Sequence, residues 1–129
     1  MLEEASWIAI VDDDPSVLKS LSRALRIHAY ETRAFASAGD FLTQLPAGAP
    51  ACLILDVQMP DMTGLELHHQ LASAGVHIPT IVITAHSEIK AREMTHAADV
   101  VAVLSKPLRN ASLFAAVALA LGPREGCKR

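Results

Sequence analysis

Side chains that can do chemistry follow directly after four short apolar runs of this sequence. They are a row of three acids, a single acid, a hydroxyl and a lysine: Asp12, Asp13 and Asp14, then Asp56, Thr84 and Lys106. Carboxylates that gather within a few ångströms repel one another, so such a site needs a cation. Hard oxygen ligands prefer Mg²⁺ or Ca²⁺, and Mg²⁺ typically takes only one or two carboxylates and keeps several waters. The pattern therefore predicts a divalent cation site at Asp12, Asp13 and Asp56.

A site of this kind leaves a carboxylate available as a nucleophile, and Asp56 is the candidate for attack on phosphorus. Lys106 would neutralise charge on the transferred phosphoryl group, and the Thr84 hydroxyl would donate to another of its oxygens. Taken alone, each residue has an ordinary structural explanation; Asp14 beside Pro15 is typical of a helix cap. Their joint placement at four strand ends indicates phosphoryl transfer by positioning and electrostatics.

Four short apolar runs and one weaker strand pattern, at 30–35, alternate with helical periodicity along the chain. The runs predict strands at residues 7–11, 30–35, 51–55, 80–83 and 100–104. Capping residues and helical spacing predict helices from Asp14-Pro15 to about His28, from Ser37 through Leu45, and at 64–74, 88–98 and 110–121. Near-continuous apolar runs are typical of parallel strands covered on both faces. The predicted fold is α/β: an open, doubly wound, five-stranded parallel sheet flanked by five helices, flavodoxin-like (βα)5, with its chemistry at the carboxyl ends of the strands.

The composition fits one cytoplasmic domain. Of the 129 residues, 51% are hydrophobic and 19% charged, with a net charge of −3 and no basic run, which argues against direct nucleic-acid contact. Cys52 and Cys127 have no metal-binding spacing and are interpreted as reduced thiols. The start, MLEEASW, lacks the basic residues of an export signal, and the longest apolar run, 113–121, is too short to span a membrane.

Four segments together resemble the receiver domain of two-component response regulators. They are IVDDDPSV at 10–17, LILDVQMPDMTGLEL at 53–67, VITAH at 82–86 and LSKPL at 104–108. The second and third look most like the FixJ-type regulators, which carry a DNA-binding output domain. The resemblance covers residues 7–121, so we expect a receiver domain at 1–122 and a linker stub or disordered tail at 123–129.

The resemblance implies a role for each matching position. Asp56 matches the phosphoacceptor, which also contacts the metal. Asp13 matches a direct Mg²⁺ ligand, Asp12 a ligand acting through water, and the backbone carbonyl of Gln58 a further protein ligand. The implied phosphodonor is a phosphohistidine on a sensor histidine kinase or a phosphotransfer protein. Such a domain is not a general enzyme, because it promotes only its own phosphorylation and dephosphorylation.

The resemblance also implies a conformational switch. Thr84 matches the switch hydroxyl and Lys106 the lysine that contacts the phosphoryl group. Phosphorylation would then change the face formed by the fourth helix, the fifth strand and the fifth helix, with residues 88–98 and 100–103 as the candidate contact surface. We expect a monomer that forms a homodimer through this face on phosphorylation and, through an output domain outside this chain, controls transcription.

Two positions depart from the family pattern. Val103 stands where many receivers have a tyrosine or phenylalanine, so a rotating aromatic ring cannot take part in the switch. Asp99 follows Ala98 where glycine is usual, so the end of the fourth helix is expected to differ. Five histidines show no metal-ligand spacing and are expected at the surface or in helices: His28, His68, His69, His77 and His96.

Three other functions share some of these features. A phosphatase of the haloacid dehalogenase type also uses a strand-end aspartate, but it needs a second one where this chain has Gln58. A flavodoxin-like nucleotide binder would offer amides to a phosphate after the first strand, whereas this loop offers three acids. A pseudo-receiver, which keeps the fold without phosphorylation, stays open because of Val103.

Overall fold

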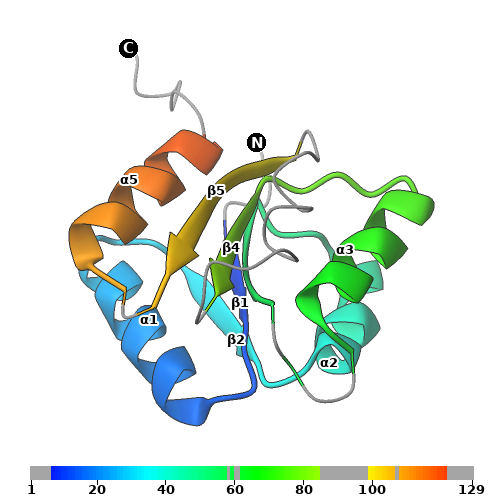
Figure 1. Cartoon of the computed structure of the whole chain (residues 1–129), viewed down its shortest axis with the longest axis horizontal. Coiled ribbons are helices and arrows are strands. Elements are labelled where there is room, and N and C mark those ends of the chain that lie inside the picture. Colours follow the sequence, from blue (N-terminus) through cyan, green and yellow to red (C-terminus); the bar gives the residue numbers. More distant parts are fainter. Residues whose placement is uncertain (1–6, 58, 60–61, 85–98, 107, 122–129) are drawn as a thin grey trace.

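The computed structural model describes residues 7–57, 59, 62–84, 99–106 and 108–121 (Figure 1). The sheet contains five parallel strands in the order β2-β1-β3-β4-β5. The strands are β1 (Ile8–Val11), β2 (Thr32–Phe35), β3 (Cys52–Asp56), β4 (Thr80–Thr84) and β5 (Val100–Ser105). The helices are α1 (Pro15–Ile27), α2 (Ala38–Gln44), the 3-10 turn η1 (Leu45–Ala47), α3 (Gly64–Ser73) and α5 (Asn110–Leu121). The predicted parallel α/β fold is confirmed, and the helix expected at 88–98 lies outside the described residues.

Helices cover both faces of the sheet. Figure 1 shows α1 and α5 on one side and α2 and α3 on the other. Alternate residues of β1 serve the two layers: Ile8 and Ile10 pack toward α1 and α5, whereas Ala9 and Val11 pack toward α2 and α3. Burial on both faces explains why the central strands are continuous apolar runs rather than alternating ones. The carboxyl ends of the strands are left as the edge where polar residues gather.

The second strand begins at Thr32, later than the start at residue 30 that the sequence pattern predicts. Ala29 follows α1 with a left-handed backbone (φ 68°), and the N–H of Tyr30 donates to the carbonyl of Leu25 at 3.1 Å. This arrangement is a helix C-cap that satisfies carbonyls left open at the end of α1. Tyr30 therefore belongs to the helix cap, and β2 starts at Thr32 instead of residue 30.

Cys52 is a free thiol in the middle of the core. Burial raises the pKa of this thiol to about 12, so it stays protonated and is a poor nucleophile at neutral pH. Cys127 lies outside the described residues.

Among the helices described, none combines the length and the apolar character needed to cross a membrane.

Thr32 carries a buried hydroxyl that has no hydrogen-bond partner among the described residues. We expect Thr32→Val to raise the free energy of unfolding by about 1 kcal/mol, because valine has the same shape without the desolvated hydroxyl. Urea unfolding followed by the fluorescence of Trp7, the only tryptophan in the chain, would measure the change. A less stable valine variant would show that the hydroxyl has a partner in solution.

Candidate functional site

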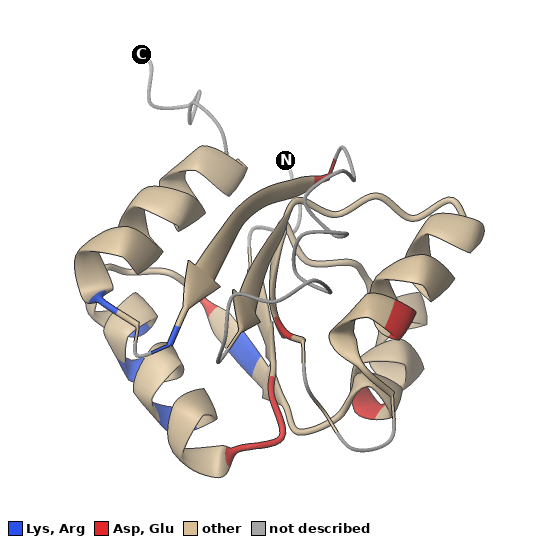
Figure 2. Cartoon of the chain, in the orientation of Figure 1, with Lys and Arg blue, Asp and Glu red and all other residues tan. Residues whose placement is uncertain are grey.

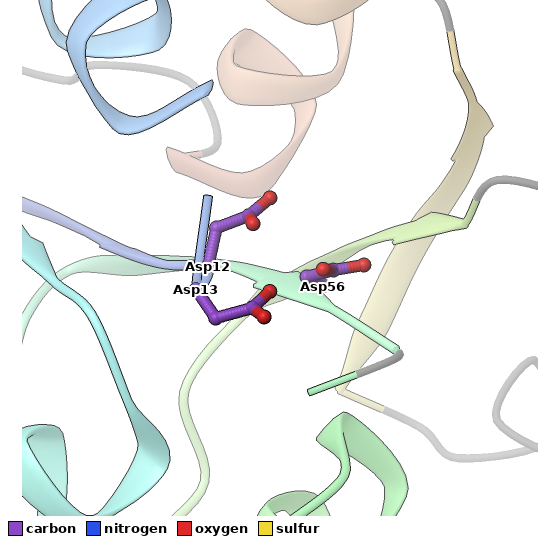
Figure 3. Close-up of side chains that lie close together, drawn as sticks. All are labelled: Asp12, Asp13 and Asp56. Atoms are coloured by element: carbon purple, nitrogen blue, oxygen red, sulfur yellow. The ribbon is translucent and has the colours of Figure 1, made fainter. Parts of the chain in front are cut away.

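Three carboxylates meet where β1 and β3 end. The two strands pair in parallel with Val11 beside Leu55, so Asp12 and Asp56 follow as neighbours. One oxygen from each of Asp12, Asp13 and Asp56 lies within 4.8 Å of the others, as the close-up in Figure 3 illustrates. Asp12 and Asp56 are 1% and 5% exposed, whereas Asp13 is exposed. The structure thus brings together the three acids expected at one site and buries two of them.

The turn into α1 determines which acids face the cluster. Asp12 accepts a hydrogen bond from the backbone N–H of Asp14 at 2.9 Å through Oδ1, which closes the turn. The carboxylate of Asp14 instead accepts from the N–H of Ser16 at 2.9 Å and caps α1, whose first residue is Pro15. Asp14 is therefore a helix cap, as its sequence context indicates, and Asp13 is the second acid of this turn that reaches the cluster.

One lysine faces two of the three acids. The Lys106 Nζ lies 3.6 Å from Oδ2 of Asp12 and 3.8 Å from Oδ2 of Asp56. Figure 2 shows acids on the turn between β1 and α1, and basic residues on α1 and at the end of β5. A single lysine cannot balance three carboxylates, so the described residues of the site carry an excess of negative charge. The arrangement favours an additional cation.

The donor set fits a hard divalent cation. Oδ2 of Asp12 is buried and accepts no hydrogen bond from the described residues, and the Lys106 Nζ at 3.6 Å is its ion-pair partner. A buried carboxylate oxygen is costly without a nearby cation, and Lys106 divides its charge between Asp12 and Asp56. Direct oxygen ligands from one or two of these carboxylates, with water reaching the site beside the exposed Asp13, suit Mg²⁺. Gln58, whose carbonyl is the fourth expected ligand, lies outside the described residues.

Thr84 ends β4, and Lys106 directly follows the neighbouring strand β5. Thr84 is the last residue of β4, is 2% exposed, and pairs with Ser105 of β5. The backbone N–H of Lys106 donates to the carbonyl of Thr84 at 2.9 Å, which continues the pairing by one more hydrogen bond. This bond fixes the base of the lysine side chain beside β4. Both residues therefore lie at the same edge of the sheet as the acids.

Gly64 contributes to the site in a way that the sequence analysis missed. It opens α3, and its N–H donates to the carbonyl of Val57 at 2.8 Å. A Cβ atom at Gly64 would lie 2.4 Å from the backbone oxygen of Asp56, a distance that requires the backbone to move. From sequence, Gly64 indicates only a turn and a helix start. Its close approach to the strand that carries Asp56 depends on tertiary structure.

Replacing Asp13 by asparagine is expected to remove most of the stabilisation that Mg²⁺ gives to the folded chain. A ligand that binds only the folded state at 100 times its Kd adds about 2.7 kcal/mol. The Asp13→Asn variant loses a charged ligand, so its thermal unfolding midpoint should respond weakly to Mg²⁺. In the absence of divalent ions the variant should be at least as stable as the wild type, because one repulsive charge is gone.

Asp40→Asn is the matched control for this measurement, since Asp40 is an exposed acid in the first turn of α2. Its midpoint should respond to Mg²⁺ as the wild type does. An equal response in the Asp13 variant would show that the acidic cluster does not bind the metal.

The sequence matches known proteins along most of its length. The family model described as "Response regulator receiver domain" matches residues 8–118. The chain is 39% identical over 127 residues to the response regulator protein TodT of Pseudomonas putida, covering 97% of this chain and 56% of that protein. It is 33% identical over 110 residues to the transcriptional regulatory protein FixJ of Rhizobium meliloti, covering 85% and 54%.

Solved structures of receiver domains have the same fold as this chain. The crystal structure of FixJ-N has a TM-score of 0.83 and 32% sequence identity, and the alignment covers 92% of this chain and 95% of that one. A CheY-like receiver domain from Methanospirillum hungatei has a TM-score of 0.84 at 25% identity, with 95% and 98% covered. The chain spans about half the length of TodT and FixJ. With the acid cluster, the lysine and the sheet in place, this chain belongs to the response regulator receiver domain family.

Proposed function

We propose that this chain is the phospho-accepting receiver of a two-component response regulator, with Asp56 as the phosphoacceptor. The observation that carries the proposal is the cluster of Asp12, Asp13 and Asp56 with Lys106 facing two of the acids. A phosphohistidine of a sensor histidine kinase or a phosphotransfer protein would be the donor. The chain acts as a cytoplasmic signalling domain that promotes only its own phosphorylation and dephosphorylation, without direct contact to nucleic acid.

In the transfer step, a carboxylate oxygen of Asp56 forms a bond to phosphorus while the bond from phosphorus to the donor imidazole nitrogen breaks. The electron pair of the broken bond stays on that nitrogen. Asp12, Asp13, Asp56 and the carbonyl of Gln58 would hold Mg²⁺, which would supply positive charge near the phosphoryl oxygens. Lys106 adds a second positive charge, and the buried hydroxyl of Thr84 donates a hydrogen bond to the phosphoryl group.

The test of this proposal is intact mass spectrometry after incubation with acetyl phosphate and Mg²⁺. We expect the wild-type chain to gain one phosphoryl group, and EDTA present during the reaction to prevent the gain. A control receiver is run beside it under the same conditions. If the control is phosphorylated and this chain binds Mg²⁺ but gains no mass, a strict requirement for its own kinase is favoured. If it neither gains mass nor binds Mg²⁺, the pseudo-receiver alternative is favoured.

The output of the domain is part of the same proposal. TodT and FixJ are about twice as long as the matched region, and FixJ carries the name transcriptional regulatory protein. We therefore assign this chain to control of transcription through an output domain that is not present in it. β5 is one of the two edge strands of the sheet, and five of its six residues are partly buried while the last is exposed, which suits a contact face that includes 88–98 and α5.

Phosphorylation is expected to convert the monomer into a homodimer through this face. Bringing Thr84 toward the phosphoryl group would shift the loop after β4 and stabilise one of two arrangements of the face. Sedimentation velocity before and after complete phosphorylation, at the same protein concentration, measures the change. Identical sedimentation coefficients in the two states would refute dimerisation, and phosphoryl transfer to Asp56 would be unaffected by that result.

A further inference from the structure

A buried histidine and an aspartate join α3 to the start of β5. Nε2 of His68 lies 2.8 Å from Oδ1 of Asp99, and the two side chains are only 8% and 17% exposed. The residues are 31 positions apart in the sequence. Nδ1 of His77 lies 3.8 Å from the other oxygen, but its side chain is 68% exposed. His68 is thus in a helix, as expected, but it is a buried partner of Asp99 rather than a surface residue.

Asp99 connects the starts of β4 and β5. It is the residue directly before β5, and its carbonyl accepts a hydrogen bond from the N–H of Thr80 at 2.7 Å, where β4 begins. The carboxylate of Asp99 contacts the side chain of His68.

The other end of α3 is fixed to the strand of Asp56. The N–H of Gly64 donates to the carbonyl of Val57, the residue after Asp56, at 2.8 Å. A capping box between Thr63 and Glu66 holds the first turn of the helix, with hydrogen bonds of 2.9 and 3.1 Å. His68 lies about one turn beyond Gly64. A rigid first turn of α3 therefore connects the residue after Asp56 to the residue before β5.

We infer that α3 couples the backbone at Asp56 to β5. In this coupling, His68 and Asp99 are positioning residues that transmit the state of Asp56 to the amino-terminal end of β5. The inference rests on the proposed function, since it assumes that Asp56 accepts a phosphoryl group. Displacement of the backbone at 56–57 is expected to move Gly64, because the two backbone segments lie so close that a Cβ atom at Gly64 would not fit between them. The His68–Asp99 pair passes the movement to the start of β5. This route does not depend on position 103, where valine replaces the usual aromatic residue.

The test is nuclear magnetic resonance of the whole, ¹⁵N-labelled chain, titrated with beryllium fluoride and Mg²⁺ as a mimic of the phosphoryl group. In the wild type, amide signals should shift both near Asp56 (Val57) and at the start of β5 (Val100). In Asp99→Ala and in His68→Leu, the signal of Val57 should still shift fully. The active-to-inactive population ratio reported by Val100 should fall by roughly fivefold or more, the lower limit of typical allosteric coupling.

Three further variants define the outcome. His69→Leu makes the same substitution at the exposed neighbour of His68 and should respond as the wild type does. Asp99→Asn keeps an acceptor oxygen for His68 and should restore at least part of the response, which a loss of folding would not allow. The double variant His68→Leu with Asp99→Ala should lose no more response than either single variant, because both break one contact.

Two results would overturn the inference. A full response of Val100 in both Asp99→Ala and His68→Leu would show that the His68–Asp99 contact does not carry the coupling, and the proposed function would stand. Failure of the mimic to shift Val57 even in the wild type would count against the proposed function, and the inference would fall with it.

Discussion

Replacing Asp56 by asparagine is expected to abolish uptake of a phosphoryl group from acetyl phosphate. The amide has no anionic oxygen to attack phosphorus, and removing the nucleophile leaves no alternative route to an acyl phosphate at this position. The side chain is 5% exposed and keeps nearly the same shape, so the fold should persist. Intact mass spectrometry should show one added group on the wild type and none on the variant.

Asp14→Asn is the matched control, because it makes the same change at the residue next to the cluster, whose carboxylate caps α1 instead of joining the cluster. Asp14 caps α1, and asparagine caps helices about as well, so this variant should keep both its stability and its phosphorylation. Phosphorylation of Asp56→Asn to the wild-type extent would mean that another residue is the phosphoacceptor. Loss of phosphorylation in Asp14→Asn would mean that the turn, rather than the nucleophile, is limiting.

Gly64→Ala should damage both the fold and the site. The new Cβ would lie 2.4 Å from the backbone oxygen of Asp56 and 3.0 Å from Cα of Val57, and neither atom belongs to a flexible side chain. The backbone at the end of β3 or the start of α3 must move, and overpacking of this kind costs about 1–3 kcal/mol. Because the movement displaces Asp56, phosphorylation by acetyl phosphate should slow even under conditions where the variant is fully folded.

The control for this variant is Gly39→Ala in the first turn of α2. A Cβ at Gly39 meets only the hydroxyl of Ser37 at 3.8 Å, an ordinary contact. Alanine there should raise stability by about 0.5–1 kcal/mol, because it removes the backbone entropy of a helical glycine. If urea unfolding gave Gly64→Ala the same stability as the wild type, the close approach between α3 and β3 would not be as tight as the structure has it.

The sequence carries enough information to predict the sheet and its functional edge. Strands covered on both faces need continuous apolar runs, and 51–55 and 80–83 are such runs because β3 and β4 lie in the interior of the sheet. Parallel strands align their carboxyl ends, so the order of strands and helices alone predicts that the acids after β1 and β3 lie together. The cluster of Asp12, Asp13 and Asp56 follows from these two facts.

Other features depend on contacts between distant segments and have no local signal. The cap at Tyr30 forms because the chain adopts a left-handed backbone at Ala29, a residue whose type does not indicate one. The pair of His68 and Asp99 joins residues 31 positions apart. Gly64 reads as a turn residue, and its approach to Asp56 appears only when α3 packs against β3. Sequence patterns describe single elements well, whereas these contacts are properties of their packing.

Locating the phosphoryl group tests most directly whether Asp56 is the phosphoacceptor. The wild-type chain is incubated with acetyl phosphate and Mg²⁺, reduced with borohydride, which converts an aspartyl phosphate to homoserine, and mapped by peptide mass spectrometry. We expect homoserine at position 56 alone, with none when EDTA is present during the phosphorylation. Homoserine at Asp12 or Asp13 instead, or labelling that does not depend on the metal, would contradict it.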